Sequence, residues 1–219
     1  NLLEENSIVL GFSPYRSSKG LLNLFIRFET VLAATQYLSF AIAGLPYMGV
    51  GRNLVYKKQL FEQAGGFKKH RHIASGDDDL FINAVANKQN TGIAITPSAF
   101  TFSIPKSSWR DFHYQKSRHL TTGSKYRLKH QILLGVFSLS HFSHYVLGFL
   151  LLTFPIYVDA VALIYLIRLI IVMSIYFFIL KKLNQKDIWP YVPFLDALFV
   201  LYYAVFATRL FFGNLNKWS

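Results

Sequence analysis

The sequence predicts an α/β domain followed by an α-helical membrane region. Helical and strand patterns alternate through the first 130 residues, which is typical of α/β structure. Residues 131–158 contain no Asp, Glu, Lys or Arg, and this run is long enough to cross a hydrocarbon core of about 30 Å. In addition, 53% of the 219 residues are hydrophobic and the mean hydropathy is +0.31. This composition is too apolar for an ordinary soluble domain, so a membrane is involved.

The charge is concentrated in the first part of the chain. Residues 1–130 carry 17 Lys and Arg against 8 Asp and Glu, whereas residues 131–219 carry 6 against 3. The basic part therefore faces an anionic partner, such as phospholipid headgroups, a nucleotide diphosphate or nucleic acid. The absence of cysteine excludes disulfides and thiolate metal sites. Because the chain begins with Asn1 and shows no leader segment, we expect a fragment or a processed piece.

The first elements alternate between strand and helix patterns. Residues 7–15 resemble a short buried strand that ends in a turn. The apolar run 21–45 has the length of a membrane span, but it contains Arg27, Glu29 and Gln36. Charged groups are costly at the centre of a bilayer helix. We therefore expect a helix that packs under a sheet or lies at the membrane surface.

A glycine-containing loop follows at residues 46–53. Gly49, Gly51 and Arg52 would let a ligand approach the backbone closely, although the loop matches neither a dinucleotide fingerprint nor a phosphate-binding loop. A simple glycine turn ahead of residues 54–56 would also account for this loop sequence. Residues 57–64 predict a short helix that ends at the following pair of glycines.

Three consecutive carboxylates, Asp77, Asp78 and Asp79, are the strongest local signal for chemistry. Adjacent carboxylates raise one another's pKa unless cations or hydrogen-bond donors stabilise their charge. A structural explanation also exists, because Ser75 and Asp78 have the spacing of a capping box and acidic residues favour a first helical turn. The triplet alone does not decide between an active site and a helix start.

The remaining α/β elements come between the triplet and the membrane region. Residues 80–88 continue a helix, and residues 91–96 and 99–104 resemble two short strands. Residues 107–120 form a helix candidate in which aromatic and basic side chains alternate, a composition that suits the headgroup level of a bilayer.

Three membrane spans are predicted, at about residues 132–154, 156–180 and 190–212. Arg168 and Asp196 lie within the second and third, where they could pair, line a passage or simply hold helices together. His141 and His144 could suggest a metal pair, but two histidines without a third ligand are more often packing residues.

The basic clusters predict the orientation of these spans. Lysine and arginine are enriched in cytoplasmic segments next to membrane helices. One cluster precedes the first span and another follows the second. We therefore expect the α/β part to be cytoplasmic and the loop 153–158 to lie outside. The clusters consist of Lys125, Arg127 and Lys129, and of Lys181, Lys182 and Lys186.

The order of these motifs resembles the C-terminal half of a membrane-anchored family 2 glycosyltransferase. A Gly-Arg-Asn loop at Gly51, Arg52 and Asn53 is followed by the acidic triplet, by Gln115 and Arg118 in Gln-x-x-Arg spacing, and by membrane helices. Asp78 and Gln115 are 37 positions apart, similar to the separation in that family. The resemblance covers essentially the whole chain.

The resemblance implies the C-terminal part of a GT-A nucleotide-diphospho-sugar transferase domain and an inverting, hexosyltransferase-like reaction. Asp78 would be the general base, with Asp77 as its neighbour. Gln115 and Arg118 would contact the donor diphosphate or the acceptor, and the Gly51, Arg52 and Asn53 loop would also bind substrate. A divalent metal, Mg or Mn, is expected from the family. The partners would be a nucleotide-diphosphate sugar, a lipid or glycan acceptor and membrane lipids, and no nucleic acid is expected.

Two departures from the family pattern limit these expectations. The metal-binding Asp-x-Asp motif would fall before Asn1, unless the acidic triplet itself is that motif. The position of the family's Trp after Arg118 is held by His119, which favours the addition of one or a few sugars over processive polymer synthesis. A non-catalytic membrane protein with a basic cytoplasmic domain, such as a transporter or scaffold subunit, is the alternative from another class.

Overall fold

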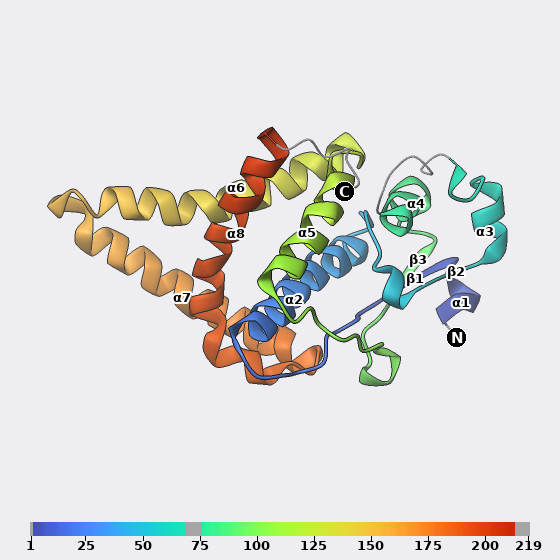
Figure 1. Cartoon of the computed structure of the whole chain (residues 1–219), viewed down its shortest axis with the longest axis horizontal. Coiled ribbons are helices and arrows are strands. Elements are labelled where there is room, and N and C mark those ends of the chain that lie inside the picture. The colour runs from blue at the N-terminus through green and yellow to red at the C-terminus, as the bar shows by residue number, and fades with distance from the viewer. Residues whose placement is uncertain (1, 69–75, 213–219) are drawn as a thin grey trace. The chain divides into compact units, whose positions relative to one another are not determined.

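The computed structural model describes residues 2–68 and 76–212, which form two compact units (Figure 1). The first unit comprises residues 1–130 and the second comprises residues 131–219. The described part of the first unit combines a small mixed sheet with several helices, and that of the second is helical.

The sheet has three short strands in the order β2-β1-β3. Strand β1 (Ile8–Gly11) lies between β2 (Leu54–Tyr56), to which it is antiparallel, and β3 (Thr91–Ala94), to which it is parallel. All four residues of β1 are buried. A strand that is covered on both faces needs a continuous apolar run, which explains why this segment does not alternate.

The predicted strand at residues 99–104 is wrong. Pro97–Ala99 forms the 3-10 helix η3, and the segment after it contains an isolated bridge between Ser103 and Tyr15 in place of a strand. Pro97 begins this turn, because its fixed φ suits the first position of a helical turn. A side-chain hydrogen bond takes the place of a backbone bond between strands here, because Ser13 Oγ donates to the Thr101 carbonyl at 2.7 Å.

Helix α2 (Leu21–Ile42) is the buried helix of the first unit and packs against β3. Phe28, Val31 and Tyr37 are almost inaccessible to solvent, and the Tyr37 hydroxyl donates to the Gly11 carbonyl at 2.7 Å. The expectation that this apolar run packs within the α/β part is therefore confirmed. Its charged residues are buried too, so each of them needs a partner.

The other helices of the first unit are α1 (Leu2–Glu5), α3 (Lys58–Gln63), α4 (Asp77–Val85) and α5 (Trp109–Gly123). Helix α3 ends before Gly65 and Gly66, which both have positive φ, as the glycine pair predicts. Ser108 is the N-cap of helix α5, and its hydroxyl oxygen accepts the Asp111 N–H at 3.1 Å.

The acidic triplet starts a helix, which is one of the two interpretations that its sequence leaves open. Gly76 holds the N-cap position of α4 with φ of 77°, and no side chain caps the helix there. Ser75 lies outside the described residues. A side chain at position 76 would collide with Thr122, so glycine is required both for its backbone conformation and for the close approach of α5. The three carboxylates occupy the first turn of α4, where the helix dipole favours negative charge.

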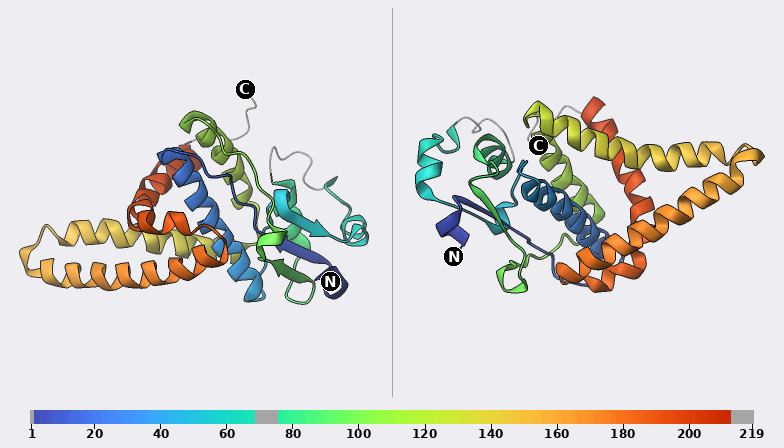
Figure 2. Two further views of the ribbon diagram at one scale, coloured as in Figure 1. Left: turned by 90° about the horizontal axis from the view of Figure 1, so that it is seen from below. Right: turned by 180° about the vertical axis from the view of Figure 1, so that it is seen from behind.

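The second unit contains helices long and apolar enough to cross a membrane (Figure 2). They are α6 (Leu128–Leu151), α7 (Val158–Lys182) and α8 (Val192–Phe212), with the 3-10 helices η4 (Pro155–Tyr157) and η5 (Lys186–Tyr191) between them. Large apolar side chains such as Phe149 and Phe178 are well exposed, which suits contact with lipid tails.

A polar network joins these three helices. Asp196 of α8 forms an ion pair with Arg168 of α7 at 2.6 Å and accepts a hydrogen bond from the Tyr145 hydroxyl of α6 at 2.6 Å. His141 Nε2 lies 3.2 Å from the other oxygen of Asp196. Of the alternatives that the sequence leaves open for Arg168 and Asp196, the structure shows an ion pair that links two helices. His144 instead packs against the Tyr165 ring, with 4.4 Å between ring centroids.

The network should stabilise the helix assembly. Arg168→Met or Asp196→Leu alone leaves one charge buried without its partner, so each should lower the free energy of unfolding by about 1 to 2 kcal/mol. The double variant leaves no lone charge and should lose less than the sum of the two. Thermal unfolding in detergent measures this cycle. Asp159→Asn removes an exposed carboxylate of α7 and is the control; strictly additive losses would show that the pair is not coupled.

Candidate active site

A cavity of about 440 Å³ in the first unit brings most of the predicted site residues together. Its walls come from the segment before α2, the glycine loop, the first turn of α4 and the middle of α5. The lining residues are Tyr15, Met48, Val50, Gly51, Arg52, Gly76, Asp77, Asp78, Asp79, Gln115, Lys116, Arg118 and His119. Carboxylates therefore face a wall of basic and amide side chains.

Asp78 is fixed by two backbone N–H groups. Gly51 donates to Asp78 Oδ2 at 2.5 Å, and Asp79 donates to Asp78 Oδ1 at 3.0 Å. A side chain at position 51 would meet Asp78 Oδ2, so the glycine permits this close approach. Burial raises the pKa of Asp78, the N–H groups of Asp79 and Gly51 oppose that rise, and the Asp77 charge adds to it. A half-buried carboxylate with a raised pKa is a stronger proton acceptor than an exposed one.

The three carboxyl groups of the triplet occupy different environments. Asp77 is exposed, whereas Asp79 is half-buried and accepts a hydrogen bond from the Tyr126 hydroxyl at 3.2 Å. Burial, and then the charge of Asp78, raises the pKa of Asp79 to about 8. Asp79 is therefore mostly protonated at neutral pH, and it adds little negative charge beside Asp78.

Helix α5 supplies the basic wall. Lys116 Nζ lies 2.6 and 2.7 Å from the two carboxylate oxygens of the buried Glu29 on α2. This ion pair gives Lys116 a fixed position at the cavity. Enclosure in the cavity, and then the charges of Lys116, Arg118 and Arg52, lower the pKa of His119 to about 4. His119 is therefore neutral at physiological pH.

The glycine loop contributes Gly51 and Arg52 but not Asn53. The Arg52 guanidinium lies over the Tyr15 ring, 4.3 Å from its centroid. Asn53 donates to the carbonyls of Phe12 and Ala99 at 2.7 and 2.8 Å, and it does not line the cavity. Its amide holds the loop against its neighbours. Of the residues assigned from the sequence, Asp77, Asp78, Gly51, Arg52, Gln115 and Arg118 all line the cavity.

Sequence reasoning missed four residues that shape this site. Tyr15 and Lys116 line the cavity, while Glu29 and Tyr126 bond to residues that do. Lys116 lies inside the Gln-x-x-Arg segment, so its position was a usable signal. The partners Glu29 and Tyr126 are separated by 87 and 47 positions from the groups that they contact. No local pattern marks such contacts.

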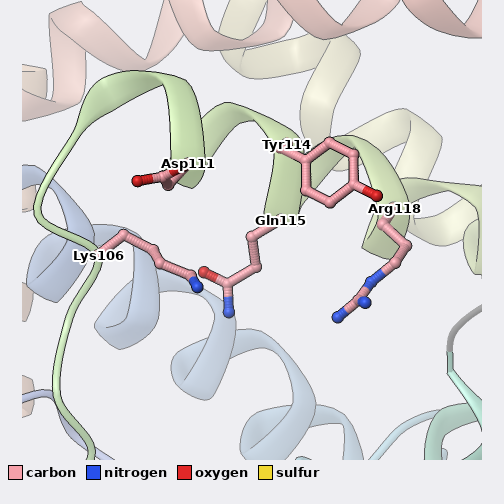
Figure 3. A pocket seen from close by; sticks show the side chains of 5 residues that line it. All are labelled: Lys106, Asp111, Tyr114, Gln115 and Arg118. Atoms are coloured by element: carbon pink, nitrogen blue, oxygen red, sulfur yellow. The ribbon is translucent and has the colours of Figure 1, made fainter. Parts of the chain in front are cut away.

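A second, smaller cavity of about 140 Å³ shares Gln115 and Arg118 with the first. Its other lining residues are Lys106, Asp111 and Tyr114 (Figure 3). Figure 3 shows the ends of Lys106, Gln115 and Arg118 on the same side of α5, whereas the Asp111 carboxylate points away from them. The two cavities are therefore neighbours that share Gln115 and Arg118.

The fold and the cavities define a protein with helices long and apolar enough to cross a membrane and with an α/β unit in which carboxylates and basic side chains line one cavity. Residues 10–207 match the family model described as "Glycosyl transferase family group 2", and the chain belongs to this family. None of the curated proteins and none of the solved structures compared with the chain matches it. The suspected family 2 resemblance is thus confirmed, and the chain is a glycosyltransferase-family protein with a membrane region.

Family 2 glycosyltransferases commonly use a divalent metal, but the described residues do not form a site for one. Asp78 accepts N–H groups with both oxygens, and Asp79 bonds to Tyr126. Across residues 2–68 and 76–212, no group of three His, Asp or Glu side chains could hold a metal ion.

The contact between Gly51 and Asp78 should be sensitive to a single methyl group. Gly51→Ala places a Cβ against Asp78 Oδ2 and should displace the carboxylate, and misplacement of a reacting group commonly costs about 10²-fold in turnover. Gly123→Ala is the matched control, because nothing lies within 4 Å of a Cβ there. Transfer rates of the two variants in membranes test this; equal rates would show that Gly51 does not position Asp78.

The raised pKa of Asp79 should make stability depend on pH. Between the ordinary carboxyl pKa of 3.8 and the folded value of about 8, the folded chain keeps a proton that the unfolded chain has lost. The free energy of unfolding should therefore fall as pH rises from about 4 to about 8. Asp79→Asn should remove this fall and raise the melting temperature at pH 8.

Tyr126→Phe is the companion variant. The Tyr126 hydroxyl lowers the pKa of Asp79, so its removal should extend the fall in stability to higher pH. Melting temperatures in detergent across this range measure both effects. An Asp79→Asn curve that keeps the wild-type slope would show that Asp79 does not carry the proton.

Proposed function

We propose that this protein is an inverting glycosyltransferase that moves a sugar from a nucleotide-diphosphate donor to a lipid or glycan acceptor at the membrane. The observation that carries the proposal is the position of Asp78, which faces the same cavity as Lys116, Gln115 and Arg118. A proton acceptor next to fixed cations matches the two needs of glycosyl transfer, because the acceptor loses a proton and the diphosphate leaves with negative charge.

Asp78 acts as the general base in this mechanism. It takes the proton from an acceptor hydroxyl while that oxygen attacks the anomeric carbon on the face opposite the diphosphate. The bond from the anomeric carbon to the diphosphate oxygen breaks in the same step, so the configuration inverts. The N–H groups of Gly51 and Asp79 hold the carboxylate in place throughout.

Two further features support the division of roles within the cavity. Asp79 holds a proton at neutral pH, so Asp78 is the ionised carboxylate beside it. Asp77 is exposed to solvent. Arg118 and Gln115 would contact the donor diphosphate or hold the acceptor, since a guanidinium can bind phosphate oxygens through two parallel hydrogen bonds. The donor-binding Asp-x-Asp motif and the rest of a GT-A domain belong, on this proposal, to sequence outside this chain.

Replacement of the base tests the proposal directly. Asp78→Asn keeps the side-chain volume but cannot accept the proton, so transfer should fall by about 10²- to 10⁴-fold. Radiolabelled UDP-, GDP- and dTDP-sugars, incubated with membranes that contain the enzyme, provide the measurement. Asp77→Asn is the comparison variant, because that carboxylate lines the same cavity but is exposed. Full activity in Asp78→Asn with loss in Asp77→Asn or Asp79→Asn would reassign the base, and full activity in all three would favour a non-catalytic protein.

His119 bears on the length of the product. Its neutral imidazole offers less stacking surface than the Trp of the family motif, so the growing sugar chain is held less firmly between additions. We expect products that carry one or a few sugars. Sizing the products of the same assay at low conversion should give short products, whereas long polymer beside untouched acceptor would identify a processive synthase.

The membrane orientation follows from the basic clusters at the helix ends. Lys125 precedes α6 and Lys182 ends α7, so both should be cytoplasmic together with the α/β unit. The sequence contains no cysteine, so each introduced cysteine is unique. Lys125→Cys and Lys182→Cys should be protected from an impermeant thiol reagent added to intact cells, while Tyr157→Cys should react. Reaction at position 182 without reaction at 157 would reverse the orientation.

A further inference from the structure

The smaller cavity contains a cation, Lys106, that has no role in the proposed reaction at Asp78. Between residues 101 and 118 there are four basic residues, namely Lys106, Arg110, Lys116 and Arg118, against the single carboxylate of Asp111. Lys116 is neutralised by Glu29. Asp111 lies in the first turn of α5, where its carboxylate accepts a hydrogen bond from the hydroxyl of the N-cap residue Ser108 at 2.7 Å. Within the described part of the chain, no ion pair involves Lys106.

The side chains in this cavity suit a phosphate group. Lys106 and Arg118 supply positive charge, and the Gln115 amide between them supplies neutral donors. Cationic donors that converge on one small space are the usual means by which proteins bind phosphate. The cavity also shares Gln115 and Arg118 with the compartment that contains Asp78, so a group bound here lies next to the reacting centre.

An exposed apolar strip leads up to the same lysine. Phe102, Ile104 and Lys106 are exposed, and Ser103 and Pro105 between them are half-buried. This alternation is that of an extended chain, in which every second side chain lies on the same face. Ile104 is 81% exposed and Phe102 is 55% exposed, so the strip presents bare apolar surface that ends at a cation.

We propose that this strip and the smaller cavity bind an amphiphilic acceptor, with its phosphate group on Lys106 and Arg118 and its hydrocarbon chain along Phe102 and Ile104. The proposal rests on the proposed function, since it names the acceptor class of that reaction as a phosphate-bearing lipid. A neutral glycan would use neither the cations nor the apolar strip. An acceptor held in this way presents its hydroxyl toward Asp78 across the shared residues Gln115 and Arg118.

Photo-crosslinking tests this site without any sugar donor. The probe is a twelve-carbon alkyl phosphate with a diazirine at the end of its chain, added to the enzyme in neutral detergent. Mass spectrometry should find the label in the segment 102–104. Lys106→Gln should reduce labelling about tenfold, as expected for the loss of one charge-assisted hydrogen bond. Lys57→Gln, which changes an exposed lysine that lines neither cavity, should leave labelling unchanged.

Three outcomes would overturn the proposal. Equal labelling of Lys106→Gln and wild type would remove the lysine from the site. Equal labelling by the same probe with a hydroxyl in place of phosphate would show that only the apolar surface binds. Competition by inorganic phosphate as strong as that by dodecyl phosphate would identify a site for free phosphate. Asp78→Asn should label like the wild type, so loss of transfer and loss of labelling can be told apart.

Discussion

The buried amide of Asn83 is the contact on which the candidate site depends most. Its Nδ2 donates to the Tyr47 carbonyl at 2.8 Å and lies 3.0 Å from His130 Nδ1, and its Oδ1 accepts the Arg127 N–H at 2.9 Å. One side chain thus links α4, the segment that leads into the glycine loop, and the segment that follows α5. Since a buried amide is costly unless it is fully bonded, these partners favour a single arrangement. In the same arrangement the Gly51 N–H donates to Asp78.

The acidic triplet shows how one helical turn can place three identical groups in three electrostatic states. Asp77 stays in water, Asp78 is stabilised by two N–H groups, and Asp79 keeps a proton beside Tyr126. Three charges in a row would repel one another, and protonation of Asp79 relieves that repulsion where solvent is least available. The sequence predicts the electrostatic conflict, but only the positions of Tyr126 and Gly51 show how it is resolved.

Patterns within a helix or a span were predictable, and contacts between distant segments were not. The charges of Arg27 and Glu29 correctly separated α2 from the membrane helices, because their burial in lipid would be costly. The same cost indicated that Arg168 and Asp196 need polar surroundings, but their pairing with each other was one of several alternatives. The strand predicted at 99–104 is wrong, because the hydrogen bonds between Ser13 and Thr101 are made by side chains and not between two strand backbones. Asn53 had the position of a binding residue in the loop, yet its bonds to two carbonyls give it a structural role.

The pairing of Glu29 with Lys116 connects these observations to the chemistry. An ammonium group held by a buried carboxylate keeps a fixed position, and the carboxylate offsets the charge that would otherwise repel Arg118 and Arg52 nearby. The cavity can therefore keep several basic side chains around one anion site without forcing them apart. Glu29, one of the charges that indicate that α2 is not a membrane span, thus also holds Lys116 in the basic wall of the cavity. The burial of α2 therefore serves both the packing of the first unit and the position of Lys116 at the cavity.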